Sequence, residues 1–351
     1  MKLIDEQDRS NYKNVWILAE FGPEGDINSV SFELIGAARA LADELGCEVW
    51  VLAPGRDPGS AAEAFISRGA DKVLAVADHR FSHFNDEFEC NVLERLVRKY
   101  RPEILLGAAT TAGRALIPRL ASKLYTGLTA DCTGLSIDKE TGELLQTRPA
   151  FGGNIMATIR SGGFRPQMAT VRPKVMKAPE PDPARTGSVI FETVEAADTV
   201  NIKEIVDAAI EAACTVNISD ANIIVAGGRA MKGPGGFKLL SELAERLGGA
   251  VGASRAAVDS GWIPYPHQVG QTGQTVQADL YISCGISGQI QHLVGMQSCK
   301  TIVAIDMDDK TPMMQLADIS IKGDLFEIIP EIIKELDRRG IKRGEQGGTT
   351  L

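Results

Sequence analysis

Short apolar runs alternate with longer segments of helical periodicity along the first 125 residues or so of the chain. Residues 15–19 (VWILA) form the uninterrupted apolar run of a strand that is buried on both faces. Between Val30 and Leu45 the apolar residues return every three or four positions, and Gly46 follows as a helix stop. Strands joined through helices need right-handed crossovers, which build a parallel sheet covered by helices. The sequence therefore predicts an α/β fold class with mainly parallel sheets.

The same unit repeats and then gives way to a second module. Further strands are expected at residues 48–53, 72–76 and 104–107, and helices near 61–67, 87–100 and 114–124. Beyond Thr126 the helical periodicity fades, and extended strands are expected in residues 144–159 and 167–171. The proline-rich residues 173–187 mark a connection, and residues 202–213 are expected to form a helix that leads into the second module.

The second module has the same alternation. Strands are expected at residues 222–226, 280–283, 301–305 and 319–321, with helices at 237–247 and 328–336. We expect Pro330 to lie in the first turn of the last helix, where no N–H is needed. A chain of 351 residues exceeds what one hydrophobic core usually supports. We therefore expect two α/β domains, residues 1–212 and 213–351.

Composition narrows the classes of partner and chemistry. The net charge is −9 and no Lys/Arg-rich run occurs, which disfavours nucleic acid and anionic membranes as partners. No apolar stretch approaches the roughly 20 residues of a membrane span, and the polar N-terminal residues do not form a signal peptide, so we expect a cytoplasmic protein. Six scattered cysteines without a Cys-x-x-Cys pair, and only four histidines, predict no metal site, including at His79 and His83.

Four glycine-containing loops of the second module share one character. They are expected at the carboxyl ends of strands, where ligands of open α/β sheets bind. Glycine lets a backbone approach a phosphate closely, and arginine offers a planar fork suited to pyrophosphate. One such loop is more often an ordinary turn, but four with two arginines favour a nucleotide-like ligand. The loops are Gly227-Gly228-Arg229, Gly252-Ala253-Ser254-Arg255, Val269-Gly270-Gln271-Thr272-Gly273 and Gly285-Ile286-Ser287-Gly288.

The usual nucleotide signatures are absent from the sequence. There is no Gly-x-Gly-x-x-Gly fingerprint, and Gly228–Gly233 lacks the Lys-Ser/Thr of a P-loop. The segments at 251–259 (VGASRAAVD), 269–273 (VGQTG) and 280–296 (LYISCGISGQIQHLVGM) instead closely resemble the α subunit of electron transfer flavoprotein. The resemblance is most specific over residues 222–336 and looser over the first module. It implies a Rossmann-like domain that binds FAD without the fingerprint.

The resemblance also implies roles for individual residues. Arg229 and Ser254 would contact the FAD phosphates, Arg255 would lie against the isoalloxazine ring, and the Thr272 hydroxyl would reach the flavin N5. The remaining implied contacts are Val269, Gly270, Gln271, Ser287, Gly288, Gln289, Ile290, Gln291, His292 near the pyrimidine oxygen, and Asp306, Asp324 and Leu325. Asp306 stands where the family usually has asparagine, and an anion beside phosphate or ribose puts that contact in doubt.

This set of residues suits an electron carrier better than an enzyme that transforms its own substrate. A cation over the ring (Arg255) and a donor beside the pyrimidine edge (His292) favour anionic flavin, and a hydroxyl at N5 (Thr272) adjusts its potential. No general-base and nucleophile pair is evident. Two other classes stay open: a self-contained flavin or NAD oxidoreductase, and a non-redox nucleotide-binding module, since the first domain could bind a nucleotide or only a protein surface.

The resemblance implies a heterodimer in which the first domain packs against a β subunit. Residues 126–133 and 147–157 look more like α subunits of anaerobes that perform electron bifurcation. There a second FAD, held mainly by the β subunit, takes a hydride from NADH. One electron then goes to ferredoxin or flavodoxin, and the other passes through the α-subunit FAD to a dehydrogenase, for example of the acyl-CoA type. The alternative is a simple one-FAD shuttle from acyl-CoA dehydrogenases to a quinone reductase.

Overall fold

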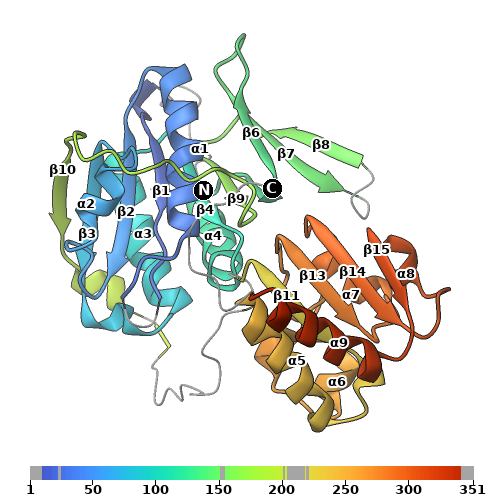
Figure 1. Cartoon of the computed structure of the whole chain (residues 1–351). Coiled ribbons are helices and arrows are strands. Elements are labelled where there is room, and N and C mark those ends of the chain that lie inside the picture. Colours follow the sequence, from blue (N-terminus) through green and yellow to red (C-terminus); the bar gives the residue numbers. More distant parts are fainter. Residues whose placement is uncertain are drawn as a thin grey trace. The chain divides into compact units, whose positions relative to one another are not determined.

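The computed structural model describes residues 10–22, 25–150, 155–200, 202–203, 218 and 221–340. The chain divides into two compact units, Met1–Ala209 and Ile210–Leu351 (Figure 1). The expected boundary at residues 212 and 213, and most of the helix expected at 202–213, lie outside the described residues. Both units are built on parallel sheets, which confirms the predicted α/β fold class.

The first unit is organised around a seven-stranded sheet in which every neighbouring pair is parallel. Its order is β10-β3-β2-β1-β4-β9-β5. Because β1 lies between β2 and β4, the chain adds strands first on one side of β1 and later on the other. The strands are β1 Val15–Leu18, β2 Val49–Gly55, β3 Lys72–Ala77, β4 Ile104–Ala108, β5 Leu128–Cys132, β9 Gln167–Val171 and β10 Ser188–Glu192.

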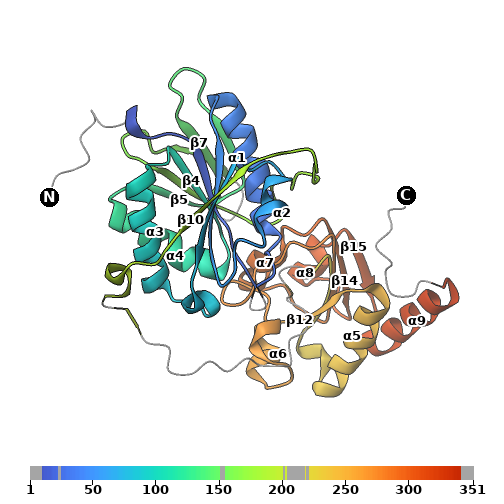
Figure 2. The same ribbon diagram turned by 90° about the vertical axis from the view of Figure 1, so that its left-hand side faces the viewer.

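Helices cover both faces of this sheet (Figure 2). α1 (Val30–Leu45) packs with α2 (Ala62–Ile66) on one face, and α1 ends at Gly46 in the left-handed conformation, as predicted. α3 (Asp86–Tyr100) and α4 (Thr111–Leu124) pack on the other face. Trp16 and Trp50 stack there with ring centroids 5.4 Å apart. Two cores on opposite faces explain why the central strands are apolar at every position.

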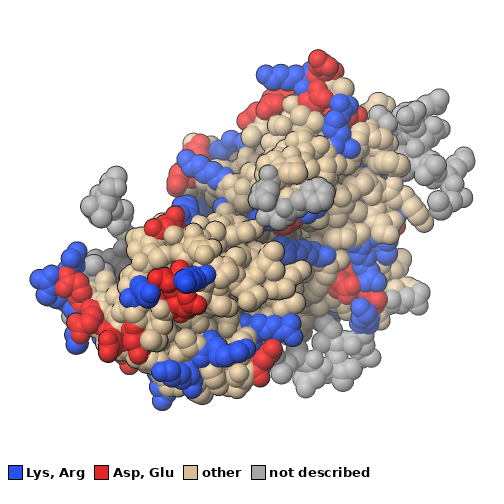
Figure 3. Space-filling model, turned by 90° about the vertical axis from the view of Figure 1, so that its right-hand side faces the viewer, with Lys and Arg blue, Asp and Glu red and all other residues tan. Residues whose placement is uncertain are grey.

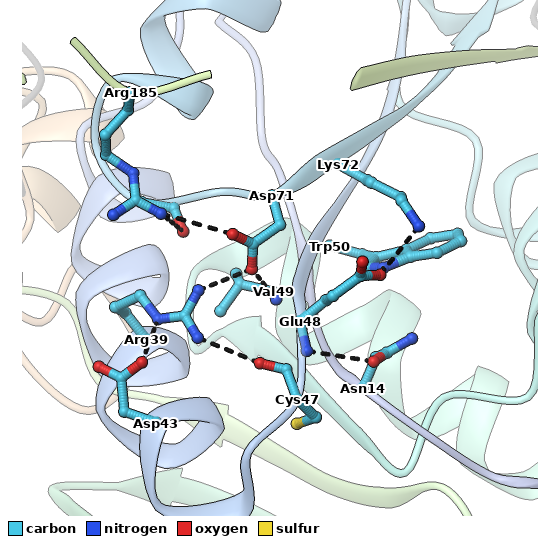
Figure 4. A network of polar contacts seen from close by, with 11 residues as sticks. Asn14, Arg39, Asp43, Cys47, Glu48, Val49, Trp50, Asp71, Lys72 and Arg185 are labelled. Atoms are coloured by element: carbon cyan, nitrogen blue, oxygen red, sulfur yellow. Dashed lines mark hydrogen bonds and ion pairs between the residues drawn. The ribbon is translucent and has the colours of Figure 1, made fainter. Parts of the chain in front are cut away.

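A polar network closes the amino-terminal edge of the sheet (Figure 4). Asp71, just before β3, accepts hydrogen bonds from Arg39 of α1 (2.6 Å) and from the backbone N–H of Val49 (2.8 Å). Glu48 accepts from Lys72 (2.9 Å) and from the Trp50 indole (2.7 Å), and these bonds lower the pKa of its carboxyl. The network joins α1, β2 and β3 at the edge opposite the strand ends where ligands of such sheets bind, so its role is structural.

A small antiparallel sheet branches from the first unit. It consists of β6 (Gly134–Ile137), β7 (Leu144–Ala150) and β8 (Ile155–Arg160), in that order. β7 and β8 lie within the extended region predicted at 144–159, whereas β5, β6 and β10 have no counterpart in the prediction. These three strands are only four or five residues long and only partly buried, so any apolar run or alternation in them is too short to reveal a strand in the sequence.

The second unit contains a five-stranded parallel sheet of order β12-β11-β13-β14-β15. α5 (Pro234–Leu247), α6 (Arg255–Asp259) and α9 (Leu325–Arg338) cover one face, and α7 (Ile290–Met296) and α8 (Pro312–Leu316) cover the other. The strands are β11 Ile223–Gly227, β12 Ala250–Ala253, β13 Leu280–Cys284, β14 Thr301–Asp306 and β15 Ile319–Lys322.

The last helix begins earlier than predicted. The carboxylate of Asp324 accepts a hydrogen bond from the backbone N–H of Phe326 (2.9 Å) and caps α9 at Leu325. Pro330 is therefore the sixth residue of the helix and lies inside it, so the prediction of a first-turn proline is wrong. No helix in the described part of the chain is long and apolar enough to cross a membrane.

Candidate functional site

The carboxyl ends of all five strands in the second unit meet at one edge of the sheet, because the strands are parallel. The residues predicted to bind a ligand follow these strands one after another. They are Ser254 and Arg255 after β12, Arg229 after β11, Ser287–His292 after β13, Asp306 at the end of β14, and Asp324 and Leu325 after β15. The tertiary structure thus places five sequence-distant segments along one edge.

The strand order reverses between β11 and β13, which is where ligands of open α/β sheets bind. The loops after these two strands approach each other through glycine. A Cβ atom on Gly228 would lie 2.0 Å from the carbonyl oxygen of Gly285, whose φ is +64°. No side chain fits between the two loops. These glycines are therefore required for loop packing, whatever else approaches them.

The glycines ahead of α5 lie in a different environment. Apart from the chain neighbours and the helix's own backbone, no atom of the described residues lies within 4 Å of the position that a Cβ would take on Gly233 or Gly235. The first turn of α5 carries no acidic residue. Pro234 has no N–H and the Gly236 N–H donates to the Gly233 carbonyl (3.1 Å), so the Gly235 N–H is the leading amide without a helical partner. Arg229 lies just before, in a short 3-10 helix at Arg229–Met231. This open helix start presents an N–H group and one guanidinium, groups that bind phosphate.

The loop at residues 269–273 does not follow a strand, contrary to the prediction. It follows a 3-10 helix at Tyr265–His267 and is attached to the edge by backbone hydrogen bonds. The Val269 N–H donates to the carbonyl of Ala253 (2.9 Å), and the Gln271 N–H donates to the carbonyl of Gln291 (2.7 Å). The loop therefore reaches the same edge by bridging the segments that follow β12 and β13.

Two side chains fix Thr272 at the tip of this loop. The side-chain amide of Gln268, which is 3% exposed, donates to the Thr272 hydroxyl (3.1 Å). The Tyr265 phenol donates to the Thr272 carbonyl (2.6 Å). Sequence reasoning missed Gln268 and Tyr265, because their contacts arise only when the loop closes on itself. The only signal in the sequence that could have pointed to them is that they lie a few residues before Thr272.

His292 lies beneath the edge and is 7% exposed. Its Nε2 atom is 2.9 Å from the hydroxyl of Tyr281, a fully buried residue of β13. Burial lowers the pKa of His292 to about 4, although a contact with the Val269 backbone acts in the opposite direction. The ring is therefore neutral at neutral pH, and it can act on a ligand as a hydrogen-bonding group but not as a cation.

Ser254 and Arg255 begin α6. The Ser254 hydroxyl is buried and makes no hydrogen bond within the part of the chain that the structure describes, although the residue occupies the N-cap position. The Arg255 guanidinium lies 3.2 Å from the Asp259 carboxylate in an exposed pair. A spare hydroxyl beside a solvent-accessible guanidinium is a donor set that suits an anionic ligand.

The two aspartates at the far end of the edge are engaged in turns. An Asp306 carboxylate oxygen accepts from the Asp308 N–H (3.0 Å), and one of Asp324 caps α9. Both residues therefore have a local structural role beside the contacts implied by the resemblance. The described residues contain no group of three or more His, Cys, Asp or Glu that could hold a metal ion.

A hollow of about 590 Å³ lies on α9, away from this edge. One helix lines it with apolar and acidic side chains, among them Ile328, Ile332 and Glu331. Such a lining offers no convergent donors for an anionic ligand, so we do not take it as the candidate site. Figure 3 shows that, on the face it presents, basic and acidic side chains are mixed and separated by uncharged surface.

Comparisons with known proteins agree with this geometry. Residues 15–199 match the electron transfer flavoprotein domain, and residues 217–297 match the electron transfer flavoprotein FAD-binding domain. The chain is 49% identical to the electron transfer flavoprotein subunit alpha of Thermoanaerobacterium thermosaccharolyticum, over 94% of this chain and 99% of that protein. The chain belongs to the electron transfer flavoprotein α-subunit family. Its second unit carries the family's FAD-binding domain.

Two further relatives of this α subunit have names that describe larger systems. The chain is 39% identical to the LctC subunit of a lactate dehydrogenase (NAD(+),ferredoxin) from Acetobacterium woodii, over 94% of this chain and 78% of that protein. It is also 39% identical to the acryloyl-CoA reductase electron transfer subunit beta of Anaerotignum propionicum, over 94% and 97%.

The residues along the edge fit FAD chemically. FAD carries a pyrophosphate and a polar ring edge, and the edge offers the matching groups. The open start of α5 and the unbonded Ser254 hydroxyl supply donors for an anion, and Arg229 and Arg255 supply positive charge. The acidic groups of the edge, Asp306 and Asp324, are confined to the far strands. Arg229 and Arg255 suit a bound diphosphate, and the Asp259 carboxylate is paired with Arg255.

Proposed function

We propose that this α subunit holds FAD along the carboxyl edge of its five-stranded sheet. Arg229 and Ser254 would contact the phosphates, and Arg255 would lie against the ring. The observation that carries the proposal is the convergence of the predicted residues on one parallel edge. The other proposed contacts are Val269, Gly270, Gln271, Thr272, Ser287, Gly288, Gln289, Ile290, Gln291, His292, Asp306, Asp324 and Leu325.

FAD supplies the one- and two-electron chemistry when it is bound, and the chain's residues set the conditions for it. Arg255 places a cation at the ring, which favours negative charge there. His292 is neutral because burial lowers its pKa to about 4, so it contributes a hydrogen bond without adding a second cation. No buried acid and base pair of the described edge residues is arranged for proton abstraction from a substrate. The α subunit is thus proposed to pass electrons on, not to transform a substrate.

We propose that β8 contributes to the surface that meets a β subunit. β8 is the outer strand of the antiparallel sheet, so one side of its backbone is unpaired (Figure 1). Its apolar residues Ile155 and Met156 are 54% and 56% exposed. Exposed apolar side chains on an unpaired strand edge favour association with another chain. Replacing Met156 with lysine should weaken the heterodimer, whereas Glu140→Lys, in the exposed turn between β6 and β7, serves as the control.

We further propose that the heterodimer works in electron bifurcation. Support comes from two relatives: the name of one joins NAD(+) with ferredoxin, and the other is named as an electron transfer subunit of acryloyl-CoA reductase. In this reading a second FAD, held mainly by the β subunit, reacts with NADH. Ferredoxin or flavodoxin receives one electron, and the α-subunit FAD delivers the other to a dehydrogenase of the acyl-CoA or a similar type.

Flavin stoichiometry tests the proposal. The chain is co-purified with its β subunit, its FAD content is measured, and NADH is added without oxygen. Two FAD per heterodimer with prompt bleaching of the flavin absorbance is the expected result. One FAD that NADH does not bleach, and that only a dehydrogenase reduces, would instead mean a simple shuttle to a quinone reductase. A colourless protein would contradict the FAD site itself.

A further inference from the structure

The hydroxyl of Thr272 has its hydrogen-bond direction set by the protein. A threonine hydroxyl has one proton to donate and two lone pairs that accept. The Gln268 side-chain N–H₂ can only donate, and it lies 3.1 Å from the Thr272 hydroxyl oxygen. One lone pair is therefore occupied from the buried side of the loop. The hydroxyl proton must point away from Gln268.

The difference in exposure between Gln268 and Thr272 shows to which side the hydroxyl proton points. Gln268 is 3% exposed, whereas Thr272 is exposed at the loop tip. The buried partner occupies the inner side of the hydroxyl, so the proton is available on the outer side. The Tyr265 phenol fixes the backbone at the same point through the Thr272 carbonyl (2.6 Å). The loop therefore presents a hydrogen-bond donor whose position and direction are both fixed.

We propose that Gln268 is a positioning residue that makes the Thr272 hydroxyl a fixed donor toward the flavin ring. The inference rests on the proposed function, in which this loop lies against FAD. A hydroxyl without such a partner can rotate and serve as donor or acceptor. With Gln268 in place one lone pair is occupied and the proton is directed outward, so the hydroxyl favours a ring that presents an acceptor at the contact.

Oxidised and fully reduced flavin differ at that contact. The N5 atom of the oxidised ring carries a lone pair that accepts a hydrogen bond, whereas N5 of the fully reduced ring carries a hydrogen that donates one. A fixed donor therefore binds oxidised FAD better than fully reduced FAD. Gln268 would thus act on the affinity ratio of the two forms, and hence on the redox potential, without touching the cofactor.

A double-mutant cycle tests this role. Gln268→Met keeps the volume and removes the amide, and Thr272→Val removes the hydroxyl. The dissociation constants of oxidised and fully reduced FAD are measured for the heterodimer with each variant and with both together. Each single variant should weaken oxidised FAD relative to reduced FAD, by about fivefold for Thr272→Val, the loss of one hydrogen bond. The double variant should equal Thr272→Val alone, because Gln268 acts only through the hydroxyl.

Independent effects of the two substitutions would overturn the proposal, because they would show that Gln268 acts elsewhere. An unchanged affinity ratio in Thr272→Val would overturn it too, although FAD binding itself would stand. Gln297→Met, an exposed site after α7, is the matched control and should leave the ratio unchanged. A wild-type heterodimer that binds no FAD would contradict the proposed function and not the Gln268–Thr272 contact.

The contact can also be measured without cofactor, even if Gln268→Met fails to fold. The side-chain amide protons of Gln268 are followed by nuclear magnetic resonance in the full heterodimer stripped of FAD. Slow exchange with solvent and a change of the amide resonance in Thr272→Val are expected, with a smaller change in Thr272→Ser, which keeps the hydroxyl. A Gln268 amide resonance that is identical in wild type and Thr272→Val would overturn the inference.

Discussion

The two parallel sheets of this α subunit reverse their strand order at corresponding places but carry opposite chemistry there. In the first unit the reversal lies between β1 and β4, and in the second between β11 and β13. Glu20 follows β1, and its carboxylate accepts a hydrogen bond from the Thr110 hydroxyl at the start of α4 (2.7 Å). At the equivalent place the second unit has the backbone of Gly228 and Gly285, and Arg229 follows Gly228.

The comparison shows that a strand reversal in a parallel sheet provides a place for a ligand, and that the side chains there decide whether an anionic ligand can bind. Burial raises the pKa of Glu20 to about 7, and that of Glu89 in α3 to about 7 as well, with the Glu20 charge contributing to the latter. Two buried carboxyl groups repel an incoming phosphate once they ionise. The hypothesis that the first unit binds a nucleotide is therefore disfavoured at its own strand reversal, which leaves protein contact as its better role.

The largest expected effect comes from a substitution that disrupts the strand reversal of the second unit, between β11 and β13. Gly228→Ala would place a Cβ 2.0 Å from the Gly285 carbonyl oxygen, and backbone must move to relieve the clash. We expect a loss of about 3 kcal/mol in the free energy of unfolding, together with most of the bound FAD. Thermal unfolding and flavin absorbance measure both. Gly163→Ala in the first unit, where an added Cβ meets no described atom within 4 Å beyond the chain neighbours, is the control. Equal stability of the two variants would refute the close approach.

The next effect concerns Glu20, at the strand reversal of the first unit. Because burial raises the pKa of Glu20 from 4.5 to about 7, the folded state holds the proton more tightly than the unfolded state. Folding stability is then lost as pH rises from 4.5 through 7, by about 3 kcal/mol in total. Glu20→Gln should be more stable than wild type at pH 8 and similar at pH 5. Glu44→Gln, on the exposed face of α1, should lack this pH-dependent gain in chemical denaturation.

Arg229→Ala tests how much positive charge contributes to FAD binding at the strand reversal of the second unit. Removing a charge-assisted contact to phosphate should weaken FAD binding by roughly 1.5–3 kcal/mol. Flavin release on dilution measures it, with Arg246→Ala on α5 as a control, since Arg246 pairs with Asp337 on α9 and does not follow a strand end. Retention of FAD equal to that of wild type would exclude Arg229 from the phosphate site.

The smallest expected effect concerns Arg255. Asp259→Asn removes the exposed partner of its guanidinium, which should cost no more than about 0.5 kcal/mol of stability. The freed charge should tighten the binding of reduced, anionic FAD about twofold at low ionic strength, and less at high salt. The dissociation constant of reduced FAD, measured by titration at a low and a high salt concentration, checks both expectations. A weakened affinity would mean that Asp259 holds Arg255 in its working position.

The sequence predicted regular elements where periodicity was strong. α1 ends at Gly46 and α5 at Gly248, because glycine adopts the left-handed conformation that stops a helix. It failed for β5, β6 and β10, which are short and partly exposed, and for β12, which has only four residues. It also misplaced Pro330, because the apolar pattern of α9 begins after the residue that caps the helix. The domain boundary near residue 212 and the individual flavin contacts remain predictions.

The sequence by itself determined the α/β class, the parallel sheets and the set of residues that mark the flavin-binding segment, because these depend on periodicity and local motifs. Only the tertiary structure decided which loops meet. The contact between Gly228 and Gly285, the neutral state of His292 beside Tyr281, and the donor direction of Thr272 set by Gln268 all require segments to be folded against each other. Burial and hydrogen-bond direction are properties of packed neighbours, and no linear pattern encodes them.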